Sequence, residues 1–194
     1  MIARVIEGVK HALPQDQIIV ATSNEASDDP LACYAQRLGV KVFRGPLEDV
    51  FNRFRLCLEA YPCDWFFRIS ADSPLLNGKI MTVMMTYIIP RLDLVTNVQK
   101  RTFPRGHSVE LLNAVSFSRI DPARLSAEDC EHVTRFYYAH PEEFHILNLE
   151  NVDSAYGKLN FAVDTLEDLR RVEEMVHTTR YDFAPEITIT AEST

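Results

Sequence analysis

The sequence predicts one α/β domain in which a mainly parallel sheet is flanked by helices. Short apolar runs of strand length alternate with amphipathic segments of helical length over residues 2–89, and polar turns follow the apolar runs. A β-α-β-α-β order implies parallel strands joined by right-handed crossovers, with helices on both faces of the sheet. A chain of 194 residues is long enough for one substantial core. We therefore expect one domain over residues 1–194, with about 179–194 as a tail.

The first half supplies the clearest elements. Apolar residues at helical spacing predict a helix over residues 2–13, and the run 18–21 predicts a short strand. Pro30 begins a second helix that Gly39 ends, in the usual Pro-first, Gly-last order. Further segments complete the pattern: strands at 40–43 and 65–69, and helices at 48–60 and about 78–89.

The second half is less regular. Strands are predicted at 94–96, 145–149 and 160–163. Ser126 with Asp129 suggests the cap of a helix running to about His140, and Thr165 with Asp168 caps a last helix to about His177.

Composition narrows the classes of function. The net charge of −8 argues against a surface that coats nucleic acid, which needs clustered positive charge. The four cysteines have no C-x-x-C spacing, so we expect reduced thiols rather than a zinc site. No apolar run approaches the roughly 20 residues of a membrane span, and the opening residues do not resemble a signal peptide. We expect a cytoplasmic protein with no nucleic-acid or membrane partner.

Two carboxylates are candidates for a metal site. RISADSPLL (68–76) puts Asp72 in a turn after a strand, and FAVDTLEDLRRV (161–172) puts Asp164 before a helix. Ligands of open α/β sheets bind beyond the carboxyl ends of strands, where two carboxylates can share one Mg²⁺. We expect the two carboxylates within about 10 Å of each other. The spacing equally fits a plain turn at Asp72 and a favourable dipole charge at Asp164.

Three arginines are candidates for anion binding, because a forked guanidinium suits phosphate and carboxylate groups. Arg44 ends the second predicted strand, Arg68 lies in the third, and Arg105 belongs to FPRGHSVELL (103–112). Taken singly, an ordinary ion pair is the better interpretation of each arginine, and Glu48 and Asp49 lie close to Arg44 in the sequence. The histidines form no recognisable catalytic set.

Five segments in order resemble one family. They are QIIVATSNEASDDP (17–30), GVKVFRGPLEDVFNRF (39–54), RISADSPLL, FPRGHSVELL with EHVTRFYY (131–138), and FAVDTLEDLRRV. Together they resemble the cytidylyltransferases of the spore-coat polysaccharide SpsF type, which are relatives of the acylneuraminate and Kdo cytidylyltransferases. The resemblance spans roughly residues 1–178.

The resemblance implies a GT-A-like nucleotidyltransferase fold, CTP and a sugar or sugar acid as substrates, Mg²⁺ as cofactor, and a homodimer. It gives Asp72 and Asp164 the catalytic role of metal ligands. The expected contacts of the nucleotide are Thr22, Ser23, Asn24, Arg44 and Arg68, and those of the sugar are Arg105 and Glu110. We expect residues 22–24, Arg44 and Arg68 to border the same cleft as Asp72.

The sequence departs from the family pattern in several places. The family opens with a central strand and a loop close to R-M-x-S-x-R-L-P-x-K that holds the triphosphate, whereas residues 1–13 match the helix after that loop. About 25 to 35 residues of the pattern, the length of a strand, loop and turn, are therefore unmatched. Ala71 stands where Gly is usual, Asn77 where Asp is common, and Ser108 where Asp is typical.

The unmatched strand would lie between the strands at Ile18 and Trp65. Without that strand, the N–H and C=O groups along the edges of its two neighbours would have no partners. A marginally stable domain can hardly tolerate two rows of unpaired backbone groups. The two neighbours could pair directly, residues 186–191 (EITITA) could supply a strand, or a partner chain could do so. We expect direct pairing, because docking a flexible tail costs more conformational entropy.

Two functions of different classes stay open. One is transfer of CMP from CTP to a sugar or sugar acid, with release of pyrophosphate. The other is an inactive remnant that acts as a binding or assembly module, and the unmatched loop leads us to expect no measurable transfer from residues 1–194. A GT-A glycosyltransferase ranks last, because the D-x-D motif is missing around Asp72.

Overall fold

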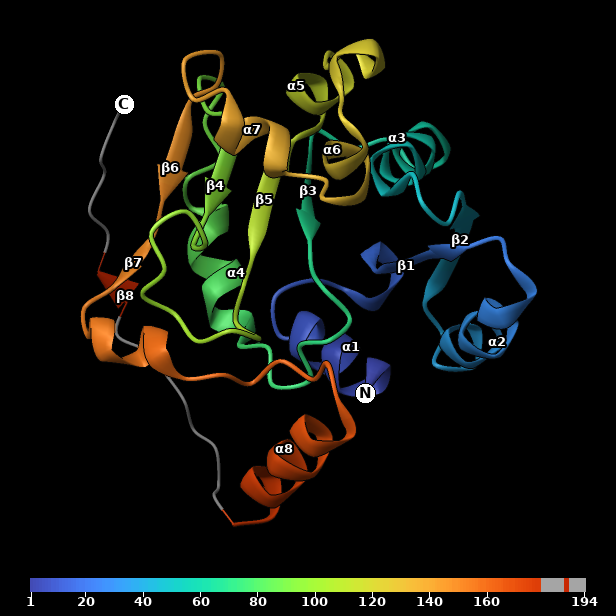
Figure 1. The fold of residues 1–194 in the computed structure, drawn as a ribbon, viewed down its shortest axis with the longest axis vertical. Coiled ribbons are helices and arrows are strands. Elements are labelled where there is room, and N and C mark those ends of the chain that lie inside the picture. Colours follow the sequence, from blue (N-terminus) through green and yellow to red (C-terminus); the bar gives the residue numbers. More distant parts are fainter. Residues whose placement is uncertain (179–186, 189–194) are drawn as a thin grey trace.

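The computed structural model of the chain describes residues 1–178 and 187–188 (Figure 1). Its first half contains α1 (Ile2–Lys10), η1 (Gln15–Gln17), β1 (Ile19–Ser23), η2 (Ala26–Asp28), α2 (Asp29–Arg37), β2 (Lys41–Gly45), α3 (Val50–Ala60), β3 (Trp65–Arg68), α4 (Gly78–Met85) and β4 (Leu94–Thr96). Its second half contains β5 (Glu110–Asn113), α5 (Ala114–Ser118), η3 (Pro122–Arg124), α6 (Ala127–Glu131), α7 (Arg135–Ala139), β6 (Ile146–Asn148), β7 (Glu150–Asn151), η4 (Ser154–Lys158), α8 (Leu166–Thr178) and β8 (Ile187–Thr188).

The strands form separate sheets rather than one. β1 and β2 make a parallel pair, and the order of the larger sheet is β3-β5-β4-β6. In that sheet β4 and β6 are parallel, whereas β5 runs antiparallel to both of its neighbours. Figure 1 shows β6, β4, β5 and β3 side by side, with β1 and β2 set apart beyond β3. The predicted α/β fold is confirmed, with β5 as an antiparallel strand in its larger sheet.

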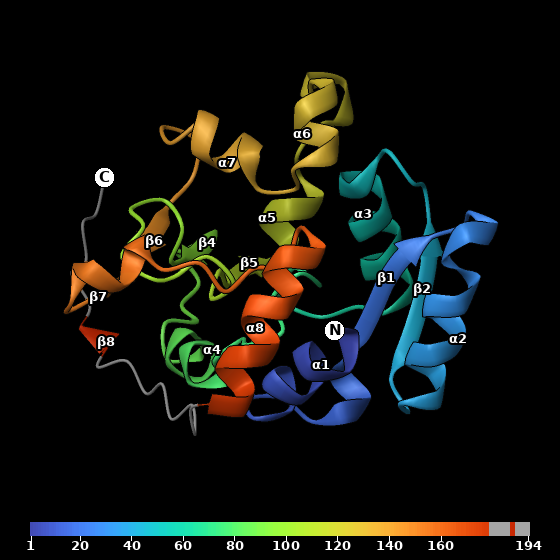
Figure 2. The same cartoon turned by 60° about the horizontal axis from the view of Figure 1, so that its bottom comes forward.

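Two apolar cores lie on opposite faces of the strands. Trp65 and Phe67 of β3 pack into the core that includes Ile6 of α1 and Met81 of α4. Phe66, between them, packs into a second core, whose helical members come from α3, α5 and α7. This alternation follows from the pleat, because successive side chains of a strand point to opposite faces. In Figure 2, α1 and α4 lie on one side of the strands, and α3, α5 and α7 on the other.

Three predicted helix caps are confirmed, whereas α1 and α4 end at Lys10 and Met85, before their predicted ends. Gly39 follows α2 with a φ of 77°, a conformation that glycine adopts without strain. Ser126 and Asp129 form a reciprocal capping box at the start of α6. Asp168 accepts a hydrogen bond from the N–H of Thr165 at 3.0 Å, and the Thr165 hydroxyl accepts from the N–H of Asp168 at 3.2 Å.

Two predicted elements are wrong in detail. The helix expected to run to His140 is split into α6 and α7, because His132 leaves helical geometry at φ −107° and ψ 84°. Residues 160–163 form no strand beyond an isolated bridge between Asn160 and Arg105. Their apolar side chains are buried, but the N–H of Val163 donates to the carbonyl of Asp72, which lies in a loop.

The prediction that the strands at Ile18 and Trp65 pair directly is also wrong. Among the described residues β1 pairs only with β2, and β3 pairs only with β5. A cleft of about 750 Å³ lies between them. The spacing is set by helix packing, because α3 contacts β1 and β2 on one side and α5 and α6 on the other.

The carboxy-terminal stretch does not fill that cleft where it is described. Residues 187–188 pair with β7 in a separate two-stranded sheet, which lies away from β1 and β3 in Figure 1. The rest of 186–191 lies outside the described residues. Apart from residues 187–188, the expected tail at 179–194 also lies outside the described residues. No helix in the described part of the chain is long and apolar enough to cross a membrane.

Candidate active site

The loop after β1 is closed by its own side chains. The Thr22 hydroxyl donates to Asp28 Oδ2 at 2.6 Å, and the N–H of Ser23 donates to the same oxygen at 3.0 Å. These hydrogen bonds, with that of Thr22 first, lower the pKa of Asp28 to about 2. Thr22 and Ser23 are buried, whereas Asn24 is exposed. Of the three predicted nucleotide contacts in this loop, Asn24 alone presents its side chain to solvent.

Arg44 fastens the same loop to β2. Its Nη1 donates to Asp29 at 2.8 Å, its Nη2 donates to the carbonyl of Glu25 at 2.8 Å, and its Nε donates to the carbonyl of Ser23. The ion pair therefore joins Arg44 to Asp29 rather than to Glu48 or Asp49. The guanidinium is committed to holding the loop in shape, which is the structural alternative that the sequence left open.

A backbone hydrogen bond brings the two predicted metal segments together. The N–H of Val163 donates to the carbonyl of Asp72 at 2.9 Å. Asp164 directly follows Val163 in the chain, so this hydrogen bond brings the backbone of Asp164 close to that of Asp72. The carboxylate of Asp72 accepts from the Ser73 hydroxyl at 2.8 Å, and Asp164 is exposed. Within the part of the chain that the structure describes, neither carboxylate forms an ion pair.

His107 links these segments, although sequence reasoning gave it no role. Its Nε2 lies 2.8 Å from the carbonyl of Leu75, in the loop that contains Asp72. Its ring packs on Phe161, ahead of Asp164, with centroids 5.2 Å apart. Burial lowers the pKa of His107 to about 4, although the hydrogen bond to Leu75 opposes that shift. A neutral, buried histidine therefore joins the two segments that carry the carboxylates.

Gly106 allows this close approach. Its φ is 88°, and a Cβ at this position would lie 2.7 Å from the carbonyl carbon of Phe161. The preceding residue pairs with the same segment, because the N–H of Phe161 donates to the carbonyl of Arg105 at 2.7 Å. A side chain at position 106 would not fit between this backbone and that of Phe161.

Arg68 and Glu110, predicted to bind different substrates, form an ion pair with each other. Their closest atoms, Nη1 and Oε2, are 3.1 Å apart, and the Glu110 side chain is only 3% exposed. The Tyr138 hydroxyl donates to the other carboxylate oxygen of Glu110 at 2.6 Å and lies 2.8 Å from the Thr96 hydroxyl. Burial first, and then the charge of Glu110, raise the pKa of Tyr138.

Two further arginines flank this network. Arg101 donates to the Ser108 hydroxyl at 3.1 Å, and burial, followed by the charge of Arg105, lowers its pKa. Arg105 itself is exposed. Sequence reasoning missed Arg101 and Tyr138 as site residues. No local pattern marks Tyr138, and only the fold brings it to Glu110, 28 positions away.

The predicted residues do not all border one cleft. Arg68 lines the cleft between β1 and β3, whereas Asp72, Arg44 and residues 22–24 are not part of its lining. These residues lie in different sheets. Arg44 and residues 22–24 belong to the β1–β2 sheet and its loop, whereas Asp72 follows β3, which belongs to the four-stranded sheet.

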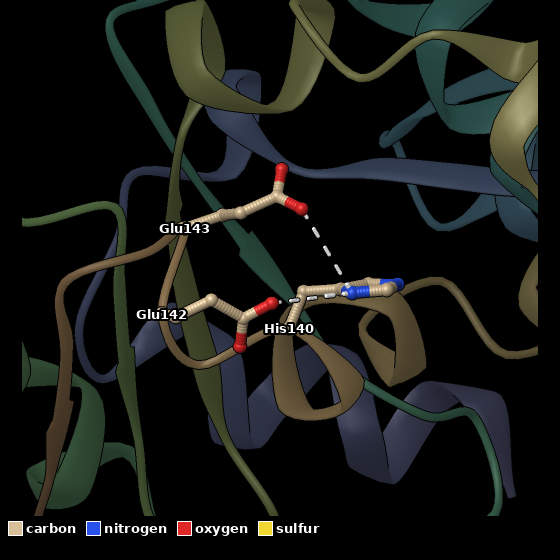
Figure 3. A group of neighbouring side chains, drawn as sticks. All are labelled: His140, Glu142 and Glu143. Carbon is tan, nitrogen blue, oxygen red and sulfur yellow. Dashed lines mark ion pairs between the residues drawn. The ribbon is translucent and has the colours of Figure 1, made fainter.

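A surface cluster joins His140, Glu142 and Glu143 (Figure 3). The Nδ1 atom of His140 lies 3.7 Å from Glu142 and 3.9 Å from Glu143. Glu143 also accepts two hydrogen bonds from Arg124, at 2.8 and 2.5 Å. Because this bidentate pair occupies both oxygens of the Glu143 carboxylate, the cluster is an ion-pair network between η3 and the turn that follows α7.

Comparison with known proteins decides the family. A sequence profile described as Cytidylyltransferase matches residues 1–192. The chain belongs to the cytidylyltransferase family. The sequence-based assignment to this family is confirmed.

Two proteins are similar in sequence over most of the chain. The spore coat polysaccharide biosynthesis protein SpsF of Bacillus subtilis is 26% identical over 179 residues, which are 90% of this chain and 73% of that protein. The uncharacterized protein MJ1063 of Methanocaldococcus jannaschii is 28% identical over 176 residues, 88% of this chain and 70% of that protein.

Two solved structures share the fold. A cytidylyltransferase from Leptospira borgpetersenii has a TM-score of 0.85 at 26% identity, over 94% of this chain and 78% of that one. A CMP:2-keto-3-deoxy-manno-octonic acid synthetase complexed with CTP has a TM-score of 0.65 at 14% identity, over 91% of this chain and 87% of that one. The nucleotidyltransferase-type fold predicted from the sequence is thereby confirmed.

Proposed function

We propose that this protein transfers CMP from CTP to a sugar or sugar acid, with release of pyrophosphate, in the synthesis of a surface polysaccharide. Family membership and the similarity to SpsF support the reaction class. The observation that carries the proposal is the hydrogen bond from Val163 to Asp72, because it joins the two segments whose carboxylates the reaction needs.

Asp72 and Asp164 are the residues proposed to hold Mg²⁺. Both offer carboxylate oxygens, the donors that this hard cation prefers, and no cationic side chain of the described residues competes for them. Two carboxylates suffice in principle, since Mg²⁺ usually keeps several waters and binds substrate phosphates. When bound, the ion would neutralise charge on the phosphates during transfer.

The remaining residues are proposed to bind and orient the substrates. Arg105 is exposed beside Arg101, and this pair of guanidinium groups suits the carboxylate of a sugar acid. Glu110 is fixed by Arg68 and Tyr138 and can accept hydrogen bonds from sugar hydroxyls only through the lone pairs that these partners leave. Asn24 is the proposed nucleotide contact of the loop that Arg44 holds.

Isothermal titration calorimetry with CTP tests the proposal. We expect binding that depends on Mg²⁺ and is lost on chelation, and we expect Asp72→Asn or Asp164→Asn to remove that dependence. Asp153→Asn is the matched control, because Asp153 is an exposed cap of η4 and asparagine caps equally well. Binding that is identical with and without the metal would reject the proposed metal ligands.

A second candidate, a binding or assembly module without catalysis, is favoured by the open cleft between β1 and β3. Pyrophosphate release from CTP in the presence of a sugar acid, abolished by Asp72→Ala, would support the enzyme. CTP binding without pyrophosphate release would support the module.

A further inference from the structure

Two of the four cysteines lie on either side of one turn. Cys57 belongs to the last turn of α3, and Cys63 lies in the short connection between α3 and β3. All four cysteines are free thiols in the structure. The other two lie elsewhere: Cys33 is on α2, and Cys130 is on α6 beside Asp49, at the start of α3. Only Cys57 and Cys63 share a turn.

The chain returns along itself at this turn. Helix α3 ends at residue 60, and the ring of Phe66, six residues later, packs on that of Phe54, six residues earlier, with centroids 6.0 Å apart. Cys57 and Cys63 stand three residues on either side of the same point. Because the two arms of a turn diverge with distance from it, the backbones of Cys57 and Cys63 lie closer together than those of Phe54 and Phe66.

Both cysteines line the cleft between β1 and β3, but they differ in access. Cys57 is buried, whereas Cys63 is exposed. Burial first, and then the nearby Cys63, raise the pKa of Cys57 to about 11, and burial followed by the charge of Asp64 raises the pKa of Cys63. A reagent from solvent therefore reaches Cys63 first, and it reaches Cys57 through Cys63.

We propose that Cys57 and Cys63 are a redox-active pair, which glutathione disulfide converts into a reversible disulfide bond between α3 and the segment before β3. The Cys63 thiolate attacks one sulfur of glutathione disulfide, forms a mixed disulfide and releases one glutathione thiolate. The Cys57 thiolate then attacks Cys63 Sγ and releases the second. The two cysteine sulfurs are oxidised and glutathione disulfide is reduced. The two cysteine protons pass through solvent to the two glutathione thiolates, so no further reactant is needed.

The bond would fasten a helix that contacts both sheets. Helix α3 contacts β1 and β2 on one side and α5 and α6 on the other. In the reduced protein only packing, such as that of Phe54 on Phe66, holds α3 against β3. A disulfide that closes residues 57–63 restricts the unfolded chain and the opening of this junction. The state of the two thiols would therefore set how firmly the sheets are held together, whether or not the protein transfers CMP.

Equilibration of the full chain with mixtures of reduced glutathione and glutathione disulfide tests the pair. A pH of about 8.5 increases the thiolate fraction. Trypsin cuts after Arg55 and Arg68, so both cysteines lie in one peptide, residues 56–68. After an acid quench, mass spectrometry should find this peptide lighter by two hydrogens and free of glutathione.

Two comparisons show whether the fold brings the thiols together. The equilibrium constant for the bond should be at least about tenfold larger in the folded protein than in the protein unfolded in urea. Amide exchange in the last turn of α3 should slow about tenfold in the oxidised protein, while exchange along α8 should not change.

Single-cysteine variants assign the two roles. In Cys57→Ala, Cys63 should keep glutathione as a stable mixed disulfide, because no second thiol releases it. In Cys63→Ser, Cys57 should stay unmodified, because it is buried. Cys33→Ser, at an exposed position of α2, is the matched control and should form the bond as the wild type does.

Two results would overturn the proposal. One is a folded wild-type protein that collects glutathione on Cys63 without forming the bond to Cys57. The other is an equilibrium constant that is no larger in the folded protein than in the unfolded one. Both are measured on the wild type, so they decide even if Cys57→Ala does not fold.

Discussion

His107 gives the structure a predicted dependence of stability on pH. The ring is buried, lies 2.8 Å from the carbonyl of Leu75, and has a pKa lowered from 6.5 to about 4. A histidine that is neutral when folded binds a proton more readily when unfolded, so the unfolded state gains protons first as the pH falls. The contribution of His107 to stability is therefore fully present above pH 6.5 and is lost as the pH falls from 6.5 towards 4.

The size of this effect follows from the shift. Because the pKa of His107 is about 2.5 lower in the folded state, the unfolding free energy falls by about 3 kcal/mol once the pH is well below 4. Between about pH 7 and pH 5 the loss of unfolding free energy should be about 2 kcal/mol, because only part of the titration lies in that interval. The Asp28 carboxyl, whose pKa is lowered from 3.8 to about 2, loses its contribution at lower pH and does not overlap this window.

Urea unfolding at several pH values measures the effect. His107→Gln keeps an N–H donor within reach of Leu75 but does not titrate, so the loss of stability between pH 7 and pH 5 should shrink by about 2 kcal/mol in this variant. His132→Gln, at an exposed position, is the control. The same pH dependence in wild type and His107→Gln would refute the assignment of a buried, neutral His107.

Three further substitutions test other contacts. Gly106→Ala should destabilise the protein by roughly 1–3 kcal/mol and weaken Mg²⁺-dependent CTP binding, because the added Cβ would lie 2.7 Å from Phe161 at a φ of 88°. A wild-type unfolding free energy and a wild-type CTP affinity in calorimetry would contradict this. Tyr138→Phe leaves one oxygen of the buried Glu110 without its donor and should cost about 1–3 kcal/mol in urea unfolding, whereas an unchanged midpoint would show that the hydrogen bond is dispensable. Asp49→Ala removes the cap that accepts from Asn52 at 2.9 Å and should cost about 1 kcal/mol, whereas Asp49→Asn should not; equal losses would exclude capping as the cause.

Local signals in the sequence predicted most elements of the fold. The Ser126–Asp129 box, the Thr165–Asp168 cap and Gly39 act within a few residues, so their outcome depends little on the rest of the chain. The strand at 94–96 was predicted with its observed bounds, since its apolar side chains are wholly buried.

The errors arose where distant segments compete for backbone hydrogen bonds. Residues 160–163 have the apolar run of a strand, but Arg105 and Asp72 take the N–H groups of Phe161 and Val163. Similarly, the expected pairing of β1 with β3 followed from strand edges alone, whereas helix α3 holds the two sheets apart. Neither outcome depends on residues adjacent in the sequence.

The candidate site was predicted in part for the same reason. Position after a predicted strand singled out the Asp72 and Asp164 segments, and the fold joins them through Val163, although residues 160–163 form no strand. No local pattern indicated that Arg44 would be committed to Ser23, Glu25 and Asp29, or that Tyr138 would reach Glu110. A single arginine or tyrosine has the same local sequence signature whether it binds a ligand or a neighbouring loop.

The proposed site is divided between two sheets. Asn24 and the loop held by Arg44 belong to the β1–β2 pair, whereas Asp72 follows β3 of the larger sheet. Helix α3 contacts β1 and β2, and it also contacts α5, which packs on the larger sheet. The packing of α3 therefore sets the separation of the two sheets, and with it the distance between the proposed nucleotide and metal contacts.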